Sequence, residues 1–398
     1  MNTAKKIAFV ANSTWNIYNF RLNLIHALVK EDIEVMVIAP VDEYIHYLDK
    51  LAGVTHIPLK RLSRNSTNPF KDVQLFRELR KIYQQQRPDL IIHYTVKPNI
   101  FGNLAARSCG IPSLCVVTGL GYTFLHQGMV KRITLMLYKL SFRFANWVAF
   151  ENPDDRQLFT SRHIVSAQKC TAVDGCGVDT NFFRIREKDR QESQVIFTFI
   201  GRLLYDKGIV EFVKAAEQVR KSIPNAAFWV IGEIDEGNPS FISKHQLVKW
   251  IEDQTIRYFG TTRDVRNFIQ QSDCIVLPSY REGLPKVILE ALSMGRPVIT
   301  TDTAGCRQTV AQAQNGFIVP VKDAQALSLA MEAFCSLPQA ERQEMGKKSR
   351  ERAVRKFDDA IVVKQYFDII GRILQNNLLD RQTDKQLVDP IHSNKHNP

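Results

Sequence analysis

The feature that most constrains the fold is an alternation of short apolar runs with amphipathic segments, which occurs in both halves of the 398-residue chain. Short apolar runs bounded by polar turns are typical of buried strands, and segments with a 3.6-residue apolar period predict helices. Repeats of this kind build parallel sheets. The expected strands cover residues 6–12, 34–39, 90–93, 113–118 and 147–150, then 196–201, 227–232, 256–260, 274–278 and 297–301.

This pattern predicts an α/β protein with two doubly wound parallel-sheet domains that face each other across a cleft, where open α/β sheets bind ligands. A polar, charge-rich stretch at residues 184–194 separates the halves. We place the first domain at residues 1–187 and the second at 188–357. An amphipathic helix over 358–379 is expected to pack back toward the first domain, and residues 380–398 are expected to form a loose polar tail.

The net charge of +12 is unevenly distributed. The first 190 residues hold 26 basic and 16 acidic side chains, and no acid occurs between Asp89 and Glu151. A basic field of this size indicates an anionic partner.

The composition excludes several classes of protein. With 44% hydrophobic and 24% charged residues, the chain is neither disordered nor fibrous. The seven cysteines are odd in number and form no C-x-x-C pair, so neither a disulfide framework nor a zinc site is indicated, and the cytoplasm is the expected compartment. No apolar run is long enough for a signal peptide or a membrane span, so any membrane association is expected to be peripheral.

The most informative segment is PSYREGLPKVILEA at residues 278–291, where an expected strand leads through a glycine-containing turn into a helix. Pro285 suits the first helical position because its fixed φ and missing N–H cost nothing there. The free amides of the first helical turn are then available to an anion. Glu282 precedes the helix and Glu290 lies inside it, so the two carboxylates are expected to contact different parts of one ligand. Glu290 is placed to accept hydrogen bonds from hydroxyls such as those of a ribose.

A second polar cluster, GRLLYDKG at residues 201–208, also stands where an expected strand passes into a helix. The Arg202 guanidinium can bind phosphate oxygens in a fork and Lys207 adds a point charge, so together they can neutralise a diphosphate. The spacing matches neither the P-loop nor the G-x-G-x-x-G fingerprint, which indicates phosphate binding of another kind.

These residues resemble the retaining glycosyltransferases of family 4, which have the GT-B fold. The resemblance covers nearly the whole chain and is strongest over residues 200–319. Arg202 and Lys207 look like the phosphate-binding pair of that family. Glu282 and Glu290 look like its E-x7-E motif, whose first Glu contacts the donor sugar and whose second contacts the ribose. The resemblance implies a donor site of Gly201, Arg202, Lys207, Glu282, Gly283, Leu284, Pro285 and Glu290, with Arg202, Lys207 and Glu282 as catalytic residues.

Three segments of the first half, at residues 97–100, 118–122 and 175–179, are similar to the branch of the family that assembles capsule, O-antigen and related lipid-linked glycans. In that branch the donor is commonly a UDP-activated N-acetylated sugar and the acceptor an undecaprenyl diphosphate sugar. The first domain would then bind the acceptor. We expect these acceptor-side residues: Asn12, Lys97, Asn99, Gly119 and Tyr122.

The implied reaction transfers a glycosyl group from a UDP-sugar with retention of the anomeric configuration. Catalysis would consist mainly of stabilising the departing nucleoside diphosphate with Arg202, Lys207 and the helix amides. We expect no cofactor and no metal, since the sequence offers no cluster of His, Cys and carboxylate ligands. The expected location is the cytoplasmic face of the inner membrane. The expected partners are the UDP-sugar, the lipid-linked acceptor and an anionic membrane surface, but no nucleic acid.

A helix expected over residues 129–147 is apolar on two sides. On a helical wheel centred on Ile133, the core stripe is expected to hold Met129, Met136, Leu137, Leu140, Phe144 and Trp147. The opposite face sets apolar residues among bases, as in an interfacial helix on anionic lipid. The residues expected on this membrane face are Arg132, Leu135, Lys139, Phe142 and Arg143.

Other interpretations stay open. A sugar-nucleotide 2-epimerase can share the fold and needs no acceptor, and a non-catalytic membrane or nucleic-acid binder would use the basic half alone. A glycoside hydrolase needs two carboxylates within about 10 Å of each other across one bond, which suits the spacing of Glu282 and Glu290 poorly. Lys97 and Asn99 could instead fix a loop, Asn12 could cap a helix, and the histidines at 93 and 126 are expected to be structural.

Overall fold

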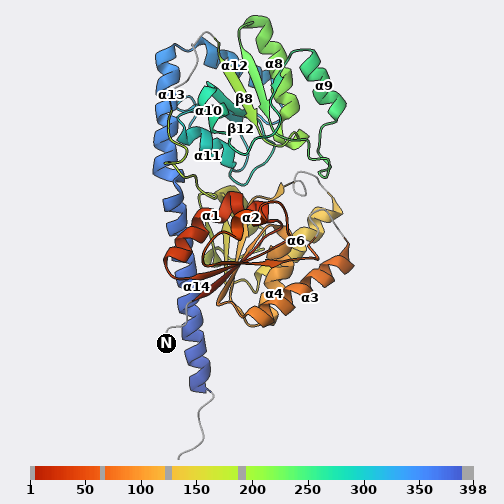
Figure 1. The fold of residues 1–398 in the computed structure, drawn as a ribbon, viewed down its shortest axis with the longest axis vertical. Helices are drawn as coiled ribbons and strands as arrows, with labels where there is room; N and C mark the ends of the chain where they lie inside the picture. Colours follow the sequence, from red (N-terminus) through yellow and green to blue (C-terminus); the bar gives the residue numbers. More distant parts are fainter. Residues whose placement is uncertain (1–4, 63–67, 122–127, 187–193, 388–398) are drawn as a thin grey trace, which may run out of the picture.

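The computed structural model describes residues 5–62, 68–121, 128–186 and 194–387, with side chains to residue 375. Two parallel sheets form the centres of two α/β domains, stacked along the long axis of the molecule (Figure 1). The first sheet has seven strands in the order β3-β2-β1-β4-β5-β6-β7, and the second has six in the order β10-β9-β8-β11-β12-β13. The predicted fold class, two doubly wound parallel-sheet domains, is confirmed.

The first sheet begins at its centre with β1 (Lys6–Val10) and grows outward in both directions. Apolar side chains fill both of its faces, because helices cover each side. Its other strands are β2 (Glu34–Ala39), β3 (Val54–Pro58), β4 (Leu90–Tyr94), β5 (Ser113–Val117), β6 (Trp147–Phe150) and β7 (Cys170–Ala172). Its helical segments are α1 (Thr14–Lys30), α2 (Ile45–Leu48), α3 (Pro69–Gln86), η1 (Pro98–Gly102), α4 (Asn103–Ser108), α6 (Met129–Phe142), α7 (Pro153–Ser161) and η2 (Ala167–Lys169).

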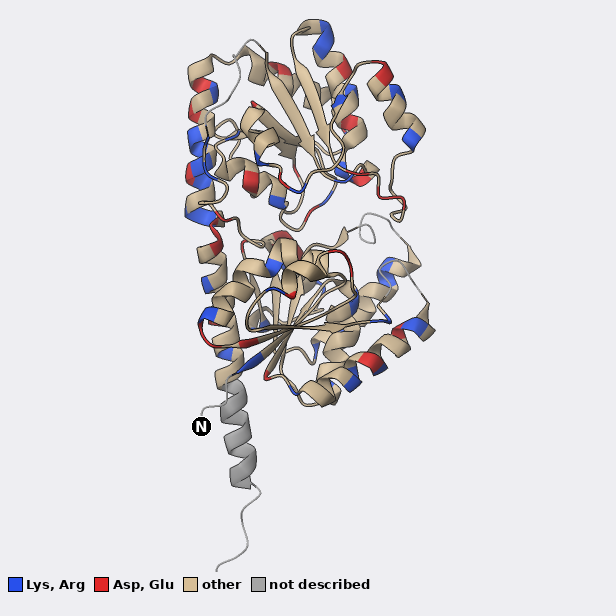
Figure 2. Ribbon diagram, viewed as in Figure 1, with Lys and Arg blue, Asp and Glu red and all other residues tan. Residues whose placement is uncertain are grey.

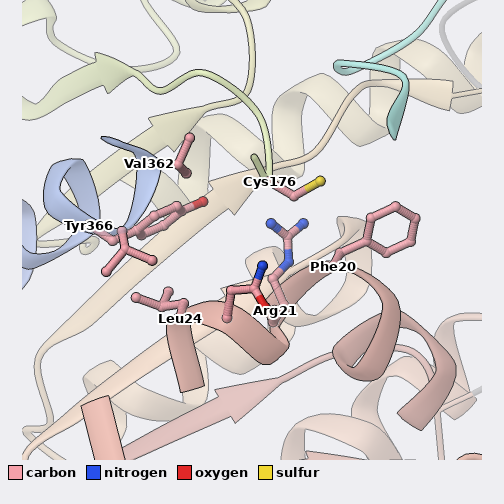
Figure 3. Close-up of a pocket in the computed structure, with 8 residues that line it drawn as sticks. Phe20, Arg21, Leu24, Cys176, Val362 and Tyr366 are labelled. Atoms are coloured by element: carbon pink, nitrogen blue, oxygen red, sulfur yellow. The ribbon is translucent and has the colours of Figure 1, made fainter. Parts of the chain in front are cut away.

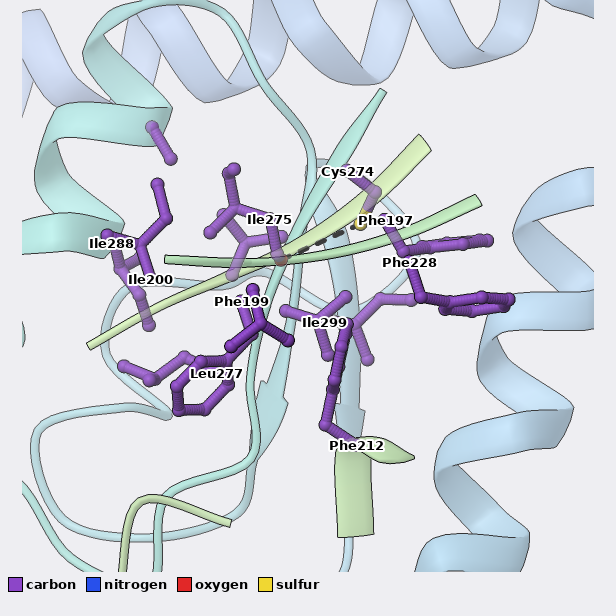
Figure 4. Close-up of a cluster of buried hydrophobic side chains, with 14 of the residues drawn as sticks. Phe197, Phe199, Ile200, Phe212, Phe228, Cys274, Ile275, Leu277, Ile288 and Ile299 are labelled. Carbon is purple, nitrogen blue, oxygen red and sulfur yellow. Dashed lines mark hydrogen bonds between the residues drawn. The ribbon is translucent and has the colours of Figure 1, made fainter. Parts of the chain in front are cut away.

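The second sheet is built in the same way around β8 (Ile196–Ile200), with an aromatic core in which Phe197 and Phe228 stack (Figure 4). Its other strands are β9 (Ala227–Ile231), β10 (Arg257–Tyr258), β11 (Cys274–Leu277), β12 (Val298–Thr301) and β13 (Gly316–Val319). Its helical segments are η3 (Tyr205–Lys207), α8 (Ile209–Ser222), α9 (Lys244–Glu252), α10 (Arg266–Gln271), α11 (Lys286–Ser293), α12 (Ala324–Ser336), α13 (Gln339–Arg352) and η4 (Ala353–Phe357).

Three strands that the sequence pattern does not reveal, β3, β7 and β13, all lie at sheet edges. The fourth edge strand, β10, spans only two of the five residues expected at 256–260. An edge strand pairs on one side only and is less covered by helices, so its sequence does not need a continuous apolar run. The central strands, which are buried on both faces, were predicted to within a residue or two.

The last helix, α14 (Asp359–Leu387), leaves the second domain and runs along the first (Figure 1). Its apolar side chains join the core cluster that contains Ile17, Ile25 and Leu28 of α1. They are Val362, Tyr366, Ile369, Ile370, Ile373 and Leu374. The expectation of a loose tail from residue 380 is wrong as far as Leu387, because a polar run without Pro or Gly can remain helical. Residues 388–398 lie outside the described part of the chain.

The expected orientation of α6 is wrong. Phe142 is 2% exposed and Tyr138 1%, and both pack against Phe159 of α7, while Leu135 is partly buried in the same cluster. Of the row assigned to the core, Met129, Met136, Leu140 and Phe144 are instead exposed, with Met129 76% and Met136 74% exposed, whereas Leu137 and Trp147 are partly buried as expected. Because this helix is apolar on two sides, periodicity alone cannot say which side packs on the sheet. Arg132, Lys139 and Arg143 are exposed as expected. Among the described helices, none has the length and apolar character that crossing a membrane requires.

Candidate functional site

Two loops that follow adjacent strands meet at the carboxyl edge of the second sheet. β8 pairs with β11, so residues 201–208 and 278–285 leave the sheet side by side. The Tyr280 N–H donates to the Asp206 carbonyl at 2.9 Å. Gly208 has φ +74°, and a Cβ there would overlap the Pro278 carbonyl oxygen, so only glycine allows the loops to approach this closely.

The two loops bring together the cations and the first carboxylate of the predicted site. Lys207 Nζ lies 2.5 Å from Glu282 Oε1, and both side chains are largely buried. Arg202 Nη1 donates to Asp235 Oδ2 at 2.6 Å, an ion pair that the sequence did not indicate. Each cation therefore pairs with a carboxylate.

The second carboxylate, Glu290, lies on α11 and is 8% exposed. Burial raises its pKa to about 7, and the ammonium of Lys286, 3.8 Å away, opposes that rise only in part. Lys286 also donates to the Asn19 carbonyl of α1 at 2.5 Å. Pro285 is the N-cap of α11, so the helix begins at Lys286, one residue later than expected.

The loop that carries Glu282 rests on the segment after β12. The Glu282 N–H donates to the Ala304 carbonyl at 3.3 Å, and the Thr303 hydroxyl donates to the Tyr280 carbonyl at 2.9 Å. A Cβ on Gly305 would overlap the Gly283 carbonyl oxygen. Backbone contacts thus define the path of the chain on both sides of Glu282.

The same loop touches the first domain at Gly283. A Cβ on Gly283 would overlap the Thr118 carbonyl oxygen and would lie 3.1 Å from Glu151 Oε2. The next residue, Gly119, has φ +105°, and a Cβ there would overlap the Gly283 backbone. Gly119 was expected on the acceptor side, and the structure places it at the contact between the two domains.

The remaining acceptor-side residues that the structure describes follow the neighbouring strands β1 and β4 at the carboxyl edge of the first sheet, but they differ in exposure and in their partners. Asn99 is 1% exposed and donates to the Val116 carbonyl at 2.8 Å, so the expectation that it faces an acceptor is wrong: its amide holds β5. Lys97 pairs with Asp72 of α3 at 2.7 Å. Asn12 is half-buried after β1, where its neighbour Ser13 caps α1. Tyr122 lies outside the described residues.

His93 is fully buried, and burial lowers its pKa to about 3. Its Nε2 lies 3.0 Å from the Tyr83 hydroxyl. The imidazole is therefore neutral at physiological pH and packs inside the first domain.

A buried ion pair in the first domain was not foreseen. Arg21 Nη2 of α1 donates to Glu151 Oε1 at 2.8 Å, and both side chains are almost completely buried. The Arg21 guanidinium also lies over the Tyr94 ring. It borders a small cavity between α1, the loop at Cys176 and Tyr366 of α14 (Figure 3). Because the partners are 130 positions apart, no local pattern could indicate the pair.

The comparisons with known proteins agree with this architecture. Residues 181–352 match the family described as glycosyl transferases group 1, and residues 6–152 match the family described as glycosyl transferase 4-like. Together with the two facing sheets, these matches define a glycosyltransferase with the GT-B fold. The chain belongs to glycosyltransferase family 4.

One relative is the N,N'-diacetylbacillosaminyl-diphospho-undecaprenol alpha-1,3-N-acetylgalactosaminyltransferase of Campylobacter jejuni, 30% identical over 93% of this chain and 100% of that protein. Another is the UDP-Gal:alpha-D-GlcNAc-diphosphoundecaprenol alpha-1,3-galactosyltransferase of Escherichia coli, 28% identical over 70% of this chain and 73% of that protein. A crystal structure of Anabaena HepE in complex with UDP superposes with a TM-score of 0.72 at 17% identity, covering 92% of this chain and 100% of that chain.

Proposed function

We propose that this glycosyltransferase moves an N-acetylated hexosamine from its UDP-sugar to a sugar linked to undecaprenyl diphosphate, with retention of configuration, during assembly of a surface glycan. The observation that carries the proposal is the ion pair of Lys207 with Glu282, formed where the loops after the adjacent strands β8 and β11 lie side by side at the carboxyl edge of the second sheet. Two relatives whose names include a sugar linked to undecaprenyl diphosphate support this class of acceptor.

The two ion pairs suggest how donor binding organises the site. When the diphosphate of the donor enters, it competes with Glu282 for Lys207 and with Asp235 for Arg202. Lys207 then neutralises phosphate, and the Glu282 carboxylate is released to accept hydrogen bonds from hydroxyls of the donor sugar. Glu290 accepts the hydroxyls of the ribose.

We further propose that no metal ion is needed. The charge that develops on the leaving UDP is met by the two cations and by the amides of the first turn of α11. Turnover should therefore persist in excess EDTA, and loss of turnover that Mg²⁺ restores would contradict this part of the proposal.

The test is a transfer assay with a panel of UDP-sugars and synthetic undecaprenyl diphosphate sugars, with the anomeric configuration of the product read by NMR. Arg202→Met and Lys207→Met should each lower kcat by about a hundredfold or more. Lys244→Met, at an exposed base of α9 in the same domain, is the matched control and should keep full activity. Normal turnover of the Arg202 and Lys207 variants would remove their phosphate role. Interconversion of a UDP-sugar without acceptor would indicate an epimerase.

We also propose that α6 contacts an anionic bilayer. The contact is made through an apolar row on the side of the helix opposite to the side expected from the sequence. The row consists of Met129, Ile133, Met136, Leu140 and Phe144, all exposed. Arg132, Lys139 and Arg143 follow one side of it, and the ribbon of α6 is blue at Lys and Arg positions in Figure 2. Apolar side chains that enter the headgroup region beside bases suit anionic lipid, at about 1 kcal/mol for each base.

The membrane contact is tested by flotation with phosphatidylglycerol vesicles. The double variant Met136→Ser with Leu140→Ser should reduce vesicle binding at least tenfold, because it removes two apolar side chains that would be buried in the lipid. Leu329→Ser with Val248→Ser, at exposed positions of the second domain, should bind like the wild type. Equal binding of both double variants would contradict the assignment of this face.

A further inference from the structure

The first turn of α7 holds a carboxylate that lies in one domain and finds its cation in the other. Asp155 is fully buried, and its Oδ1 accepts a hydrogen bond from Arg281 Nη2 of the loop after β11. Its other oxygen accepts from Asn152 Nδ2 at 3.0 Å. Burial raises the pKa of Asp155, and the Arg281 guanidinium opposes this rise. Arg281 is thus the charge that compensates Asp155.

The same turn makes a second contact with the loop. Asn152 caps α7 by accepting from the Asp155 N–H at 2.7 Å. Its amide also donates to the Gly283 carbonyl at 2.9 Å. Arg281 and Gly283 are the residues immediately before and after Glu282. The first domain therefore contacts the residue on each side of this carboxylate, through the side chain of Arg281 and the backbone of Gly283.

The Arg281 contact compensates the Asp155 charge while the domains touch. If the Arg281 cation were lost in that state, the Asp155 charge would stay buried with a single amide partner, and a buried charge that loses its counterion is strongly destabilised. Conversely, Asp155 and Asn152 favour the geometry in which Gly283 touches Thr118. The conformation of the loop that presents Glu282 is thus coupled to contact with the first domain.

We propose that Asp155 and Asn152 are positioning residues for the transfer reaction: they act through Arg281 and Gly283 to orient Glu282 toward the donor sugar when the domains meet. This inference rests on the donor site proposed above. It assigns to the first domain a role in arranging the donor side of the cleft.

An adjacent contact supplies a matched control. Asp154, in the same helical turn, accepts from Arg307 Nη1 and from Gln308 Nε2, each at 3.1 Å. This contact also joins the domains, but it does not touch the loop of Glu282. If domain adhesion were all that mattered, Asp154→Asn and Asp155→Asn would have similar effects.

The experiment measures kcat, the KM for the donor, UDP-sugar affinity by calorimetry and the melting temperature of the full chain. Asp155→Asn should lower kcat by about tenfold to a hundredfold, the range expected for one charge-assisted hydrogen bond. UDP-sugar affinity should stay within about threefold and the melting temperature should change little. Asp154→Asn should keep kcat within about twofold.

Variants of Arg281 test the pairing. Arg281→Met should lose at least as much kcat as Asp155→Asn, and Arg281→Lys should recover part of that loss because it keeps the charge. The double variant Asp155→Asn with Arg281→Met should be no worse than Arg281→Met alone, since both changes remove the same interaction.

Three results would overturn the inference. The first is wild-type kcat in Asp155→Asn, and the second is an equal loss of kcat in Asp154→Asn. The third is a loss of kcat in Asp155→Asn that is matched by proportionate losses of melting temperature and UDP-sugar affinity. Each of them leaves the proposed donor site intact. That site fails separately, if Glu290→Gln binds the UDP-sugar as the wild type does.

Discussion

The raised pKa of Glu290 makes donor affinity depend on pH in the range where few other groups titrate. A ribose hydroxyl donates a hydrogen bond to the carboxylate but has to compete with the proton of the neutral acid. With a pKa of about 7, the carboxylate form is about one-tenth populated at pH 6 and about nine-tenths at pH 8. UDP-sugar affinity should therefore rise about tenfold between these two values.

The same shift has the opposite effect on stability. The pKa of Glu290 is about 7 in the folded protein against an ordinary 4.5, so the folded state holds the proton more tightly than the unfolded state does. The free energy of unfolding then falls as pH rises from about 4.5 through about 7, by about 3 kcal/mol in total for this residue. Above pH 7, Glu290→Gln should melt several degrees higher than the wild type, because it buries no charge.

The assay is titration calorimetry with a UDP-sugar, whose phosphates are both esterified, because the terminal phosphate of free UDP titrates near pH 6 itself. Glu290→Gln should bind more weakly at pH 8 and lose the tenfold dependence. Asp359, whose pKa burial raises to about 6, is present in both proteins, so the difference between them isolates Glu290. A wild-type affinity that is flat from pH 6 to pH 8 would refute the reasoning.

Two further predictions concern the close approach of the domains at Gly283 and the buried Arg21–Glu151 pair of the first domain. Gly283→Ala places a methyl group on the Thr118 carbonyl and should lower kcat at least tenfold. The control Gly371→Ala, whose methyl group enters open space on α14, should leave kcat unchanged and keep or slightly raise the melting temperature. Equal activity of the two variants would mean that the close approach at Gly283 is unimportant. Arg21→Met leaves the Glu151 charge buried and should destabilise the fold by about 3–5 kcal/mol. Adding Glu151→Met should recover most of this loss, as measured by thermal melting. If the double variant is as unstable as the single one, the unpaired Glu151 charge is not the cause of the destabilisation.

Much of the fold and the polar side chains of the candidate site follow from local patterns. A central parallel strand needs an unbroken apolar run, so β2 and β6 were expected with the bounds that the structure has. The cluster of Lys207 and Glu282 was predicted because each residue follows a buried strand, and the carboxyl ends of neighbouring parallel strands lie at one edge. These signals act over a few residues, which is why a single sequence can display them.

Contacts between distant segments were decided only in the tertiary structure. α6 has two apolar sides, and the rings of Phe142 and Phe159 determine which one is buried. Asp155 and Arg281 are 126 positions apart, and each by itself looks like an ordinary charged residue of a polar segment. An amphipathic period or a turn residue is a property of neighbouring positions, whereas the partner of a buried charge depends on how two independently built domains meet. That meeting surface is specified by shape and charge complementarity across the cleft, for which the linear order of residues carries no local signal.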